Sequence, residues 1–305
     1  MITLHDWRDR ERAHRVRVRH LLSGHEDRQQ RGVAHPVEDF LFTYYTFRPN
    51  QLRRWSPGLG YAIPSMDAPQ ARWQLYRTTP DGMVTVDADL IAERRSVLVQ
   101  TIRRLLRATT ARSPALGCFG MHEWAMVYRL DADDVRHSSW PMRFDAGHIA
   151  DIVEERGLRC THFDAFRFFT EPARPLNQMS LSREQQIEHE QPGCLHAGMD
   201  LYKWAYKLTP AVSSDLVLDA LELARDIRYV DMRASPYDLE TLGLAPIAVE
   251  TGQGRAEYVR HQQDFARRAA PIRRQLLEVY EQLAGVTAAC SPASARAEPL
   301  SRPAP

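Results

Sequence analysis

Apolar residues recur at helical spacing in two neighbouring segments of the chain. Residues 194–208 carry apolar side chains on most faces of a helix, and residues 215–230 repeat the 3.6-residue pattern. The two segments are separated by Thr209-Pro210, which breaks a helix, and by Ser213-Ser214, which is typical of a helix N-cap. This arrangement predicts an antiparallel helical hairpin, and we expect the hairpin to lie at the centre of one large domain.

The same periodicity predicts further helices outside the hairpin. They span residues 37–48, 89–112, 146–156 and 257–283, and a glycine-hinged buried helix is expected within residues 117–128. Residues 141–144 and 158–169 are strand-like in their pattern, which places Cys160, His162, Asp164 and Phe166 on one face. Few βαβ units are visible. The pattern therefore predicts a mainly α protein with a small β-sheet, an α+β fold.

The chain divides into three parts by composition. Residues 1–34 form a basic, helical N-terminal segment, and residues 35–284 contain the apolar periodicity of the globular domain. Residues 285–305 are rich in Pro, Ala and Ser and poor in large apolar side chains, so we expect a disordered tail.

Ionisable residues follow one face of each helix of the hairpin. His196, Asp200, Lys203 and Lys207 are spaced by four, three and four residues, and Asp215, Asp219, Glu222 and Asp226 repeat this spacing. In an antiparallel hairpin with these stripes facing each other, the opposed pairs are Lys207–Asp215, Lys203–Asp219, Asp200–Glu222 and His196–Asp226. Such a seam is either a structural set of ion pairs or the polar wall of a site.

Of the four opposed pairs, Asp200 and Glu222 are the pair that suits acid/base catalysis. Two adjacent carboxylates cannot both ionise easily, so the pKa of one rises and an acid/base pair results. Lys203 would oppose this effect by favouring the charged carboxylate. The chain has 38 arginines and only two lysines, both in this segment. Because the lysine amine is compact and its pKa is readily shifted, Lys203 joins Asp200, Glu222 and His196 as a candidate catalytic residue.

Histidines paired with carboxylates indicate a second possible chemistry. Imidazole and carboxylate ligands together suit zinc, iron or manganese. His162 and Asp164 on one strand face, with His196 and Asp200 on one helix face, would form a four-ligand site for Zn or Fe. His122 and Glu123 are adjacent on a helix and point about 100° apart, so they do not both face one metal directly.

Composition excludes several classes of protein. The net charge of +1 is not that of a strongly basic nucleic-acid-binding domain, although residues 1–31 hold eight arginines against five acids. No apolar run is long enough for a membrane span, so we expect a cytoplasmic protein with no membrane partner. The four cysteines lie far apart, which favours reduced thiols. The sequence leaves the oligomeric state open.

Five strings resemble a known family. They are HPVEDFLFTYY (35–45), GCFGMHEWAMVY (117–128), HFDAFRFF (162–169), EQPGCLH (190–196) and MDLYKWA (199–205). They are similar to an actinobacterial family commonly labelled 3-methyladenine DNA glycosylase, and the resemblance covers most of residues 35–270. It implies a DNA N-glycosylase, a hydrolase of base-excision repair that removes alkylated purines from DNA and needs no cofactor.

A glycosylase requires a carboxylate, a pocket for the flipped base and cations for the phosphates. The resemblance implies Asp200 and Glu222 for the first role. The candidates for the base pocket are Phe163, Phe166, Phe168, Phe169, Tyr202 and Trp204, and Glu123 is a further substrate-binding candidate. The candidates for the phosphates are Arg53, Arg54, Lys203 and Lys207. Two alternatives stay open: a metal-dependent small-molecule enzyme that uses the His/carboxylate set, and a non-catalytic nucleic-acid-binding protein.

Overall fold

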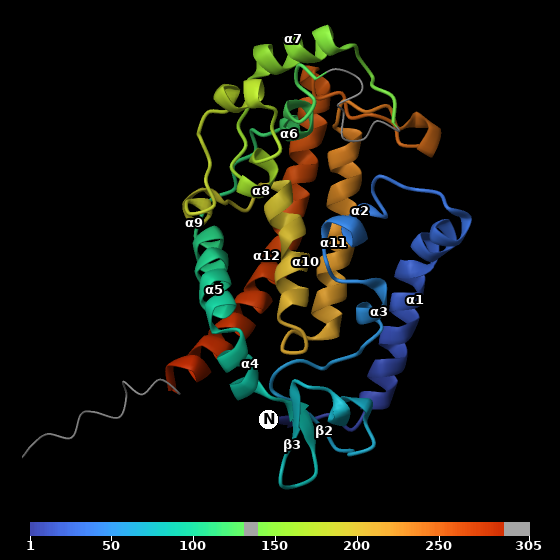
Figure 1. Ribbon diagram of the computed structural model, residues 1–305, viewed down its shortest axis with the longest axis vertical. Coiled ribbons are helices and arrows are strands. Elements are labelled where there is room, and N and C mark those ends of the chain that lie inside the picture. The colour runs from blue at the N-terminus through green and yellow to red at the C-terminus, as the bar shows by residue number, and fades with distance from the viewer. Residues whose placement is uncertain (131–139, 290–305) are drawn as a thin grey trace, which may run out of the picture.

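The computed structural model describes residues 1–130 and 140–289, and it confirms the mainly α fold with a small sheet (Figure 1). The helical hairpin consists of α10 (Leu195–Lys207) and α11 (Ser214–Arg233). The Ser213 side chain caps α11 by accepting a hydrogen bond from the Leu216 amide. The hairpin is the centre of the bundle, as expected, and the long helix α12 (Gly252–Ala289) packs along it.

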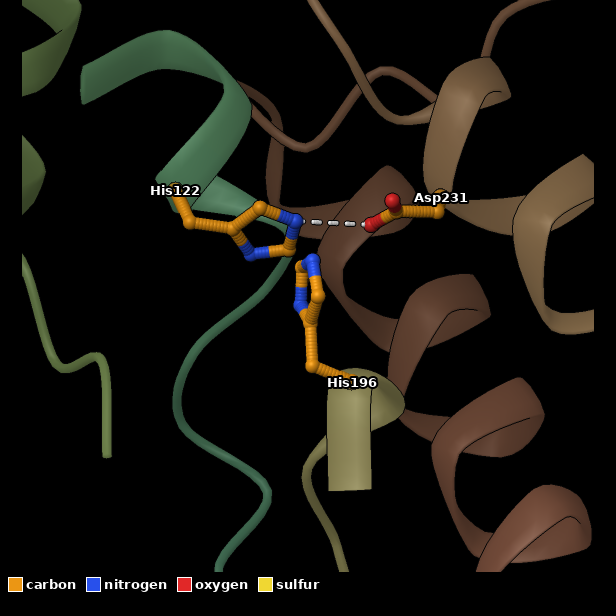
Figure 2. Close-up of side chains that lie close together, drawn as sticks. All are labelled: His122, His196 and Asp231. Carbon is orange, nitrogen blue, oxygen red and sulfur yellow. Dashed lines mark ion pairs between the residues drawn. The ribbon is translucent and has the colours of Figure 1, made fainter. Parts of the chain in front are cut away.

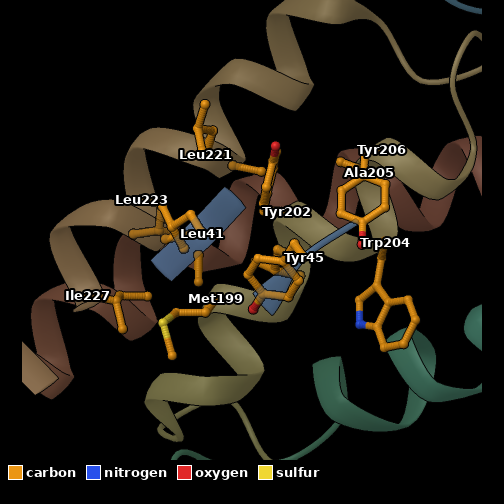
Figure 3. Close-up of a cluster of buried hydrophobic side chains, with 14 of the residues drawn as sticks. Leu41, Tyr45, Met199, Tyr202, Trp204, Ala205, Tyr206, Leu221, Leu223 and Ile227 are labelled. Carbon is orange, nitrogen blue, oxygen red and sulfur yellow. The ribbon is translucent and has the colours of Figure 1, made fainter. Parts of the chain in front are cut away.

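Aromatic and branched side chains join the two helices of the hairpin. Tyr202 of α10 is fully buried and meets Tyr45 edge to face, with 5.6 Å between the ring centres. Met199 lies in the same cluster as Leu223 and Ile227 (Figure 3). Gly198 lies at a point of close approach, because a Cβ atom there would be 2.7 Å from Ile227 Cδ1. The small residue therefore leaves room for the Ile227 side chain between the two helices.

Shorter helices surround the hairpin. The N-terminal helix α1 (Trp7–Arg31) buries Trp7, Val18 and Leu22 in the common core, so residues 1–34 pack against the rest of the chain. The others are α2 (Phe40–Tyr44), α3 (Pro49–Leu52), α6 (Met121–Ala125), α7 (Ala146–Arg156), α8 (Phe163–Phe166) and α9 (Gln186–His189), with 3₁₀ turns at Pro69–Arg72, Glu171–Leu176 and Glu240–Leu242.

Three of the expected helices differ in length from the prediction. The helix expected over 89–112 is two helices, α4 (Ala88–Arg94) and α5 (Ser96–Thr110), divided at Arg95. The helix expected over 37–48 is reduced to α2. The last helix begins earlier than 257 and continues to Ala289, past residue 285 where the tail was expected to start. Residues 290–305 of that tail lie outside the described residues.

The β-sheet forms in a part of the chain where it was not expected. Its four strands are β1 (Ile2–Thr3), β2 (Tyr61–Ile63), β3 (Tyr76–Thr78) and β4 (Val84–Val86), in the order β1-β2-β4-β3. β1 is parallel to β2, and the other pairs are antiparallel. Figure 1 shows the sheet at the end of the bundle where α10 turns into α11.

The predicted strands at 141–144 and 158–169 are wrong. Met142 and Leu158 each form only an isolated bridge, with Tyr237 and Asn177 respectively. Residues 163–166 then form the helical turn α8, because the backbone of Ala165 and Phe166 bonds to the His162 carbonyl instead of to a neighbouring strand. None of the helices in the described ranges is long and apolar enough to span a membrane.

Candidate metal centre

The acidic stripe of α11 faces away from α10. Arg17 of α1 lies 2.6 Å from Asp219 Oδ1 and 3.0 Å from Glu222 Oε2, and Arg268 of α12 lies 2.5 Å from Asp226 Oδ2. Asp215 is exposed. The four predicted pairs across the hairpin are therefore wrong, including Asp200–Glu222. The reason is that α11 turns its apolar face toward α10. Its acidic residues form ion pairs with arginines of the outer helices α1 and α12.

The stripe of α10 instead faces the segment around α8. The Lys203 amine lies 2.6 Å from Asp200 Oδ2 and 3.2 Å from Asp164 Oδ2. The Tyr45 hydroxyl donates to Asp200 Oδ1 at 3.0 Å. Burial opposes ionisation of Asp200, but Lys203 and His162 outweigh it and lower the pKa of Asp200. Asp200 is thus a buried, ionised partner of Lys203 and not an acid with a raised pKa.

The four residues expected to bind a metal do not converge on one point. His162 Nε2 lies 3.5 Å from Asp200 Oδ2 and 3.6 Å from Glu190 Oε2, and its ring lies 5.3 Å from that of His196. Asp164 is engaged by Lys203 and by Arg183, at 2.8 Å. Of the predicted set, only His196 belongs to the cluster in the described ranges whose ligand atoms converge.

That cluster consists of His122, His196 and Asp231. Its ligand atoms all lie within 4.8 Å of one another, and all three residues are buried. They come from three elements: α6, the first turn of α10 and the last turn of α11 (Figure 2). The rings of His122 and His196 meet edge to face with their centres 4.4 Å apart. The closed hairpin therefore brings together residues that are distant in sequence.

Two atoms of the cluster form a buried ion pair. His122 Nε2 lies 2.9 Å from Asp231 Oδ1 (Figure 2), and both atoms are buried and have no other partner among the described residues. A metal ion at this point would replace the proton of His122, because a metal binds the neutral imidazole.

A buried arginine holds the carboxylate of the cluster. Arg228 Nη1 donates to Asp231 Oδ2 at 2.7 Å and to Glu123 Oε1 at 2.6 Å, and its guanidinium lies 4.0 Å from the centre of the Phe40 ring. The cation leaves Asp231 Oδ1 pointing toward His122. Such outer contacts fix the orientation of a metal-binding carboxylate.

The surroundings of the cluster shift the pKa values of its two imidazoles in opposite directions. Burial disfavours the charged form of His122, but Asp231 outweighs it and raises the pKa of His122. Burial also disfavours ionised Asp231, yet His122 and Arg228 together lower the pKa of Asp231. Burial and then the charge of His122 lower the pKa of His196 well below its usual value. His196 is thus a neutral imidazole, the form that binds a metal.

The backbone before His122 adopts an uncommon conformation. Phe119 and Gly120 have φ angles of 50° and 73°, and the left-handed region is unfavourable for a residue such as Phe119. This tight turn starts α6 and directs both His122 and Glu123 into the interior. Local backbone strain of this kind is concentrated at functional sites.

A small cavity reaches the cluster. It has a volume of about 50 Å³, and its lining includes His196, Glu123, Arg228, Asp164 and Tyr44. Met126, Phe40, Phe168 and Tyr237 complete the wall. The polar stripe of α10 therefore lines a cavity at its inner end, where His196 lies, while Lys207 at its outer end is exposed.

The residues expected to bind a base do not share one pocket. Phe166, Tyr202 and Trp204 are buried in the core, and Phe163 packs under the Arg183 guanidinium. Phe168 and Glu123 do line the small cavity. Arg53 pairs with Glu26, and Arg54 lies at a second, larger cavity near the sheet. Two of these eight predicted binding residues thus lie at the candidate site.

Asp231 and Arg228 were not among the predicted site residues, although the sequence contains a signal for them. Both lie on the apolar face of α11: Arg228 is four residues after Ala224, and Asp231 is four residues after Ile227. Charged residues on an apolar helix face must be paired or must bind a ligand, because an unpaired buried charge is very unfavourable. The prediction relied instead on the acidic residues of the opposite face of α11.

Comparison with models of protein families, with curated proteins and with solved structures gives no significant match to this chain. The function of the protein is therefore inferred from the geometry of the cluster.

Proposed function

We propose that this protein is a metal-dependent enzyme that acts on a small molecule. The observation that carries the proposal is the cluster of His122, His196 and Asp231, three buried residues whose ligand atoms all lie within 4.8 Å of one another. Two histidines and one carboxylate are the ligand set of many Fe(II) enzymes and of some zinc hydrolases. Three protein ligands leave positions for water or substrate.

The ligand types admit more than one metal. Imidazole and carboxylate ligands suit both Fe(II) and Zn²⁺. The 2.9 Å between His122 Nε2 and Asp231 Oδ1 is the distance of their direct ion pair, so it does not select one of the two metals.

Neighbouring residues have distinct roles in the proposed site. Arg228 is a positioning residue, since it holds Asp231 Oδ2 and balances the negative charge of Glu123. Glu123 lines the cavity and is placed to accept or donate a proton beside the metal. A cavity of about 50 Å³ limits the substrate to a small group, or to the reactive end of a larger molecule.

Metal binding tests the proposal directly. The purified protein is stripped with a chelator and titrated anaerobically with Fe(II), and separately with Zn²⁺, by calorimetry. We expect one ion per chain for the unaltered protein and for His20→Ala, which changes an exposed histidine of α1. We expect no saturable binding for His122→Ala or His196→Ala. Binding that survives both substitutions, or no binding by the unaltered protein, would refute the site.

Removal of alkylated purines is the function implied by the family resemblance, and it stays a prediction. Its expected acid pair is separated, because Glu222 is bound by Arg17 and Asp200 by Lys203. Incubation of the protein with methylated DNA, with and without the added metal, measures release of the base. Release that requires no metal and is lost in Asp200→Asn would favour the glycosylase over the metal enzyme.

A further inference from the structure

A second, larger cavity of the described chain lies at the other end of the hairpin from the metal cluster. Its volume is about 630 Å³, and it is bounded by the α10–α11 turn at Thr209 and Pro210, by α1, by α3 and by the chain before β3. Volumes of 300–1,000 Å³ are typical of sites that bind small molecules. About 13 residues of α10 separate His196 from Thr209, a distance of roughly 20 Å along the helix. The cavity is thus distinct from the metal site.

The charge of this cavity is one-sided. Arg54, Arg72 and Arg95 belong to its wall, and no aspartate or glutamate does. The whole chain has 40 basic residues and 39 acidic ones, so a wall with three arginines and no acid is not a reflection of composition. Arg54 and Arg72 are exposed, and neither forms an ion pair within the described parts of the chain. An anion would compensate these charges.

Arg95 lies deeper in the cavity wall. Its Nη1 atom donates to the carbonyl oxygens of Lys207, at 2.6 Å, and of Thr209, at 3.0 Å, which holds the guanidinium at the hairpin turn. Burial lowers the pKa of Arg95. No carboxylate pairs with it in residues 1–130 and 140–289. A half-buried cation without a counter-ion is unfavourable, and a ligand anion in the cavity would relieve this cost.

A buried, neutral histidine belongs to the same wall. His14 is 2 % exposed, and its Nε2 atom lies 2.8 Å from the Leu52 carbonyl, to which the ring N–H donates. Burial lowers the pKa of His14, so the ring adds no positive charge to the wall. The cations of the wall are therefore the three arginines.

The remaining wall combines aromatic and apolar side chains with uncharged polar ones. Trp73 and Tyr76 meet edge to face with 5.7 Å between their ring centres, and the Arg54 guanidinium lies 5.8 Å from the centre of the Trp73 ring. Phe47, Leu52 and Leu218 also line the cavity. Aromatic rings and guanidinium planes both stack on flat molecules. The body of the ligand is therefore planar and apolar.

We propose that this cavity is a binding site for an organic anion with a planar apolar body. Its acidic group is placed at Arg54, Arg72 and Arg95, and its ring system against Trp73. This site does not depend on the metal-dependent function proposed above.

A fluorescent sulfonate tests the charge requirement. The probe is 8-anilino-1-naphthalenesulfonate, and N-phenyl-1-naphthylamine is the matched neutral compound with the same ring system. Binding is measured from probe fluorescence on the folded full-length protein. We expect saturable binding of the sulfonate, at least tenfold tighter than that of the neutral compound. Equal affinities for the two would overturn the proposal.

Substitutions locate the binding. The double variant Arg54→Gln/Arg72→Gln removes two exposed cations that form no ion pairs, and Arg104→Gln removes an exposed cation of α5 outside the cavity wall. We expect the double variant to bind the sulfonate at least tenfold more weakly and the α5 variant to bind normally, both with unchanged circular dichroism. Unchanged binding in the double variant, or equal weakening in the control, would overturn the proposal.

Discussion

Replacement of Lys203 by methionine should be among the most destabilising single changes near the α10 stripe. The amine is the partner of two carboxylates, since it lies 2.6 Å from Asp200 and 3.2 Å from Asp164. The side chains of Lys203 and Asp200 are only 13 % and 2 % exposed. Methionine retains the approximate length of the side chain but removes the charge, and with it the contact of the amine with the Trp204 ring, whose centre is 4.3 Å away. Asp200 would then keep Tyr45 as its donor and lose its nearest cation.

The expected loss follows from the burial of Asp200. Removing one partner of a buried ion pair costs about 3–5 kcal/mol, because it leaves an uncompensated buried charge. An exposed pair would cost at most about 1 kcal/mol. At roughly 2–4 °C per kcal/mol, the melting temperature should fall by roughly 6–20 °C. The double variant Asp200→Asn/Lys203→Met should lose less than the sum of its single changes, because the buried charge is removed with its partner.

Urea unfolding followed by circular dichroism measures these differences. Lys207→Met is the matched control, since Lys207 is the other lysine of the same helix, is exposed and forms no ion pair within the described residues. It should change the free energy of unfolding by less than about 0.5 kcal/mol. A loss below about 1 kcal/mol for Lys203→Met would refute the assignment of Asp200 as a buried, ionised partner of this lysine.

Three further changes test other parts of the fold. Gly198→Val should destabilise the protein by about 1–3 kcal/mol in urea unfolding, because the added side chain would overlap that of Ile227 in the packed core; no loss would mean that Ile227 moves aside without cost. Tyr45→Phe should cost about 1–2 kcal/mol, since Asp200 loses a hydrogen bond in the interior; an unchanged midpoint would contradict this contact. Although burial opposes ionisation of Asp39, hydrogen bonds from His25, the His35 amide and Arg28 lower its pKa below the usual value of 3.8. Asp39 therefore stabilises the fold above about pH 4, and this contribution is lost as the pH falls through the lowered pKa. The stability difference between the unaltered protein and Asp39→Asn should accordingly be larger at pH 7 than at pH 3; equal differences would refute the argument.

The sequence was sufficient to predict the hairpin, because apolar periodicity, the Thr209-Pro210 break and the Ser213 cap all agree. It was insufficient for the sheet, since strands of two or three residues contain too few positions to establish an alternating pattern. The strand predicted at 158–169 was wrong although its alternation of apolar and polar residues is regular. A helical turn begins there at His162, which the alternating pattern does not indicate.

The candidate site was predicted in part. His196 follows from its stripe on α10, and the buried position of α6 follows from its apolar residues. The partners of these residues could not be deduced, because the contact of α6 with the end of α11 depends on how distant segments pack. The rotation of α11 about its own axis decided whether Asp231 or the Asp219 stripe faced inward, and local spacing does not determine that rotation.

The walls of the small cavity differ from its floor in a way that affects entry. The floor is formed by α10 and α11, which are long and packed against α12, whereas residues of α2, α6 and α8 in the wall belong to helices of only four or five residues. Short elements with few internal hydrogen bonds open at a lower free-energy cost than the whole fold. A molecule larger than the closed cavity could therefore enter through a transient local opening while the hairpin stays folded. Amide hydrogen exchange would record this as faster exchange in the three short helices than in α10 and α11.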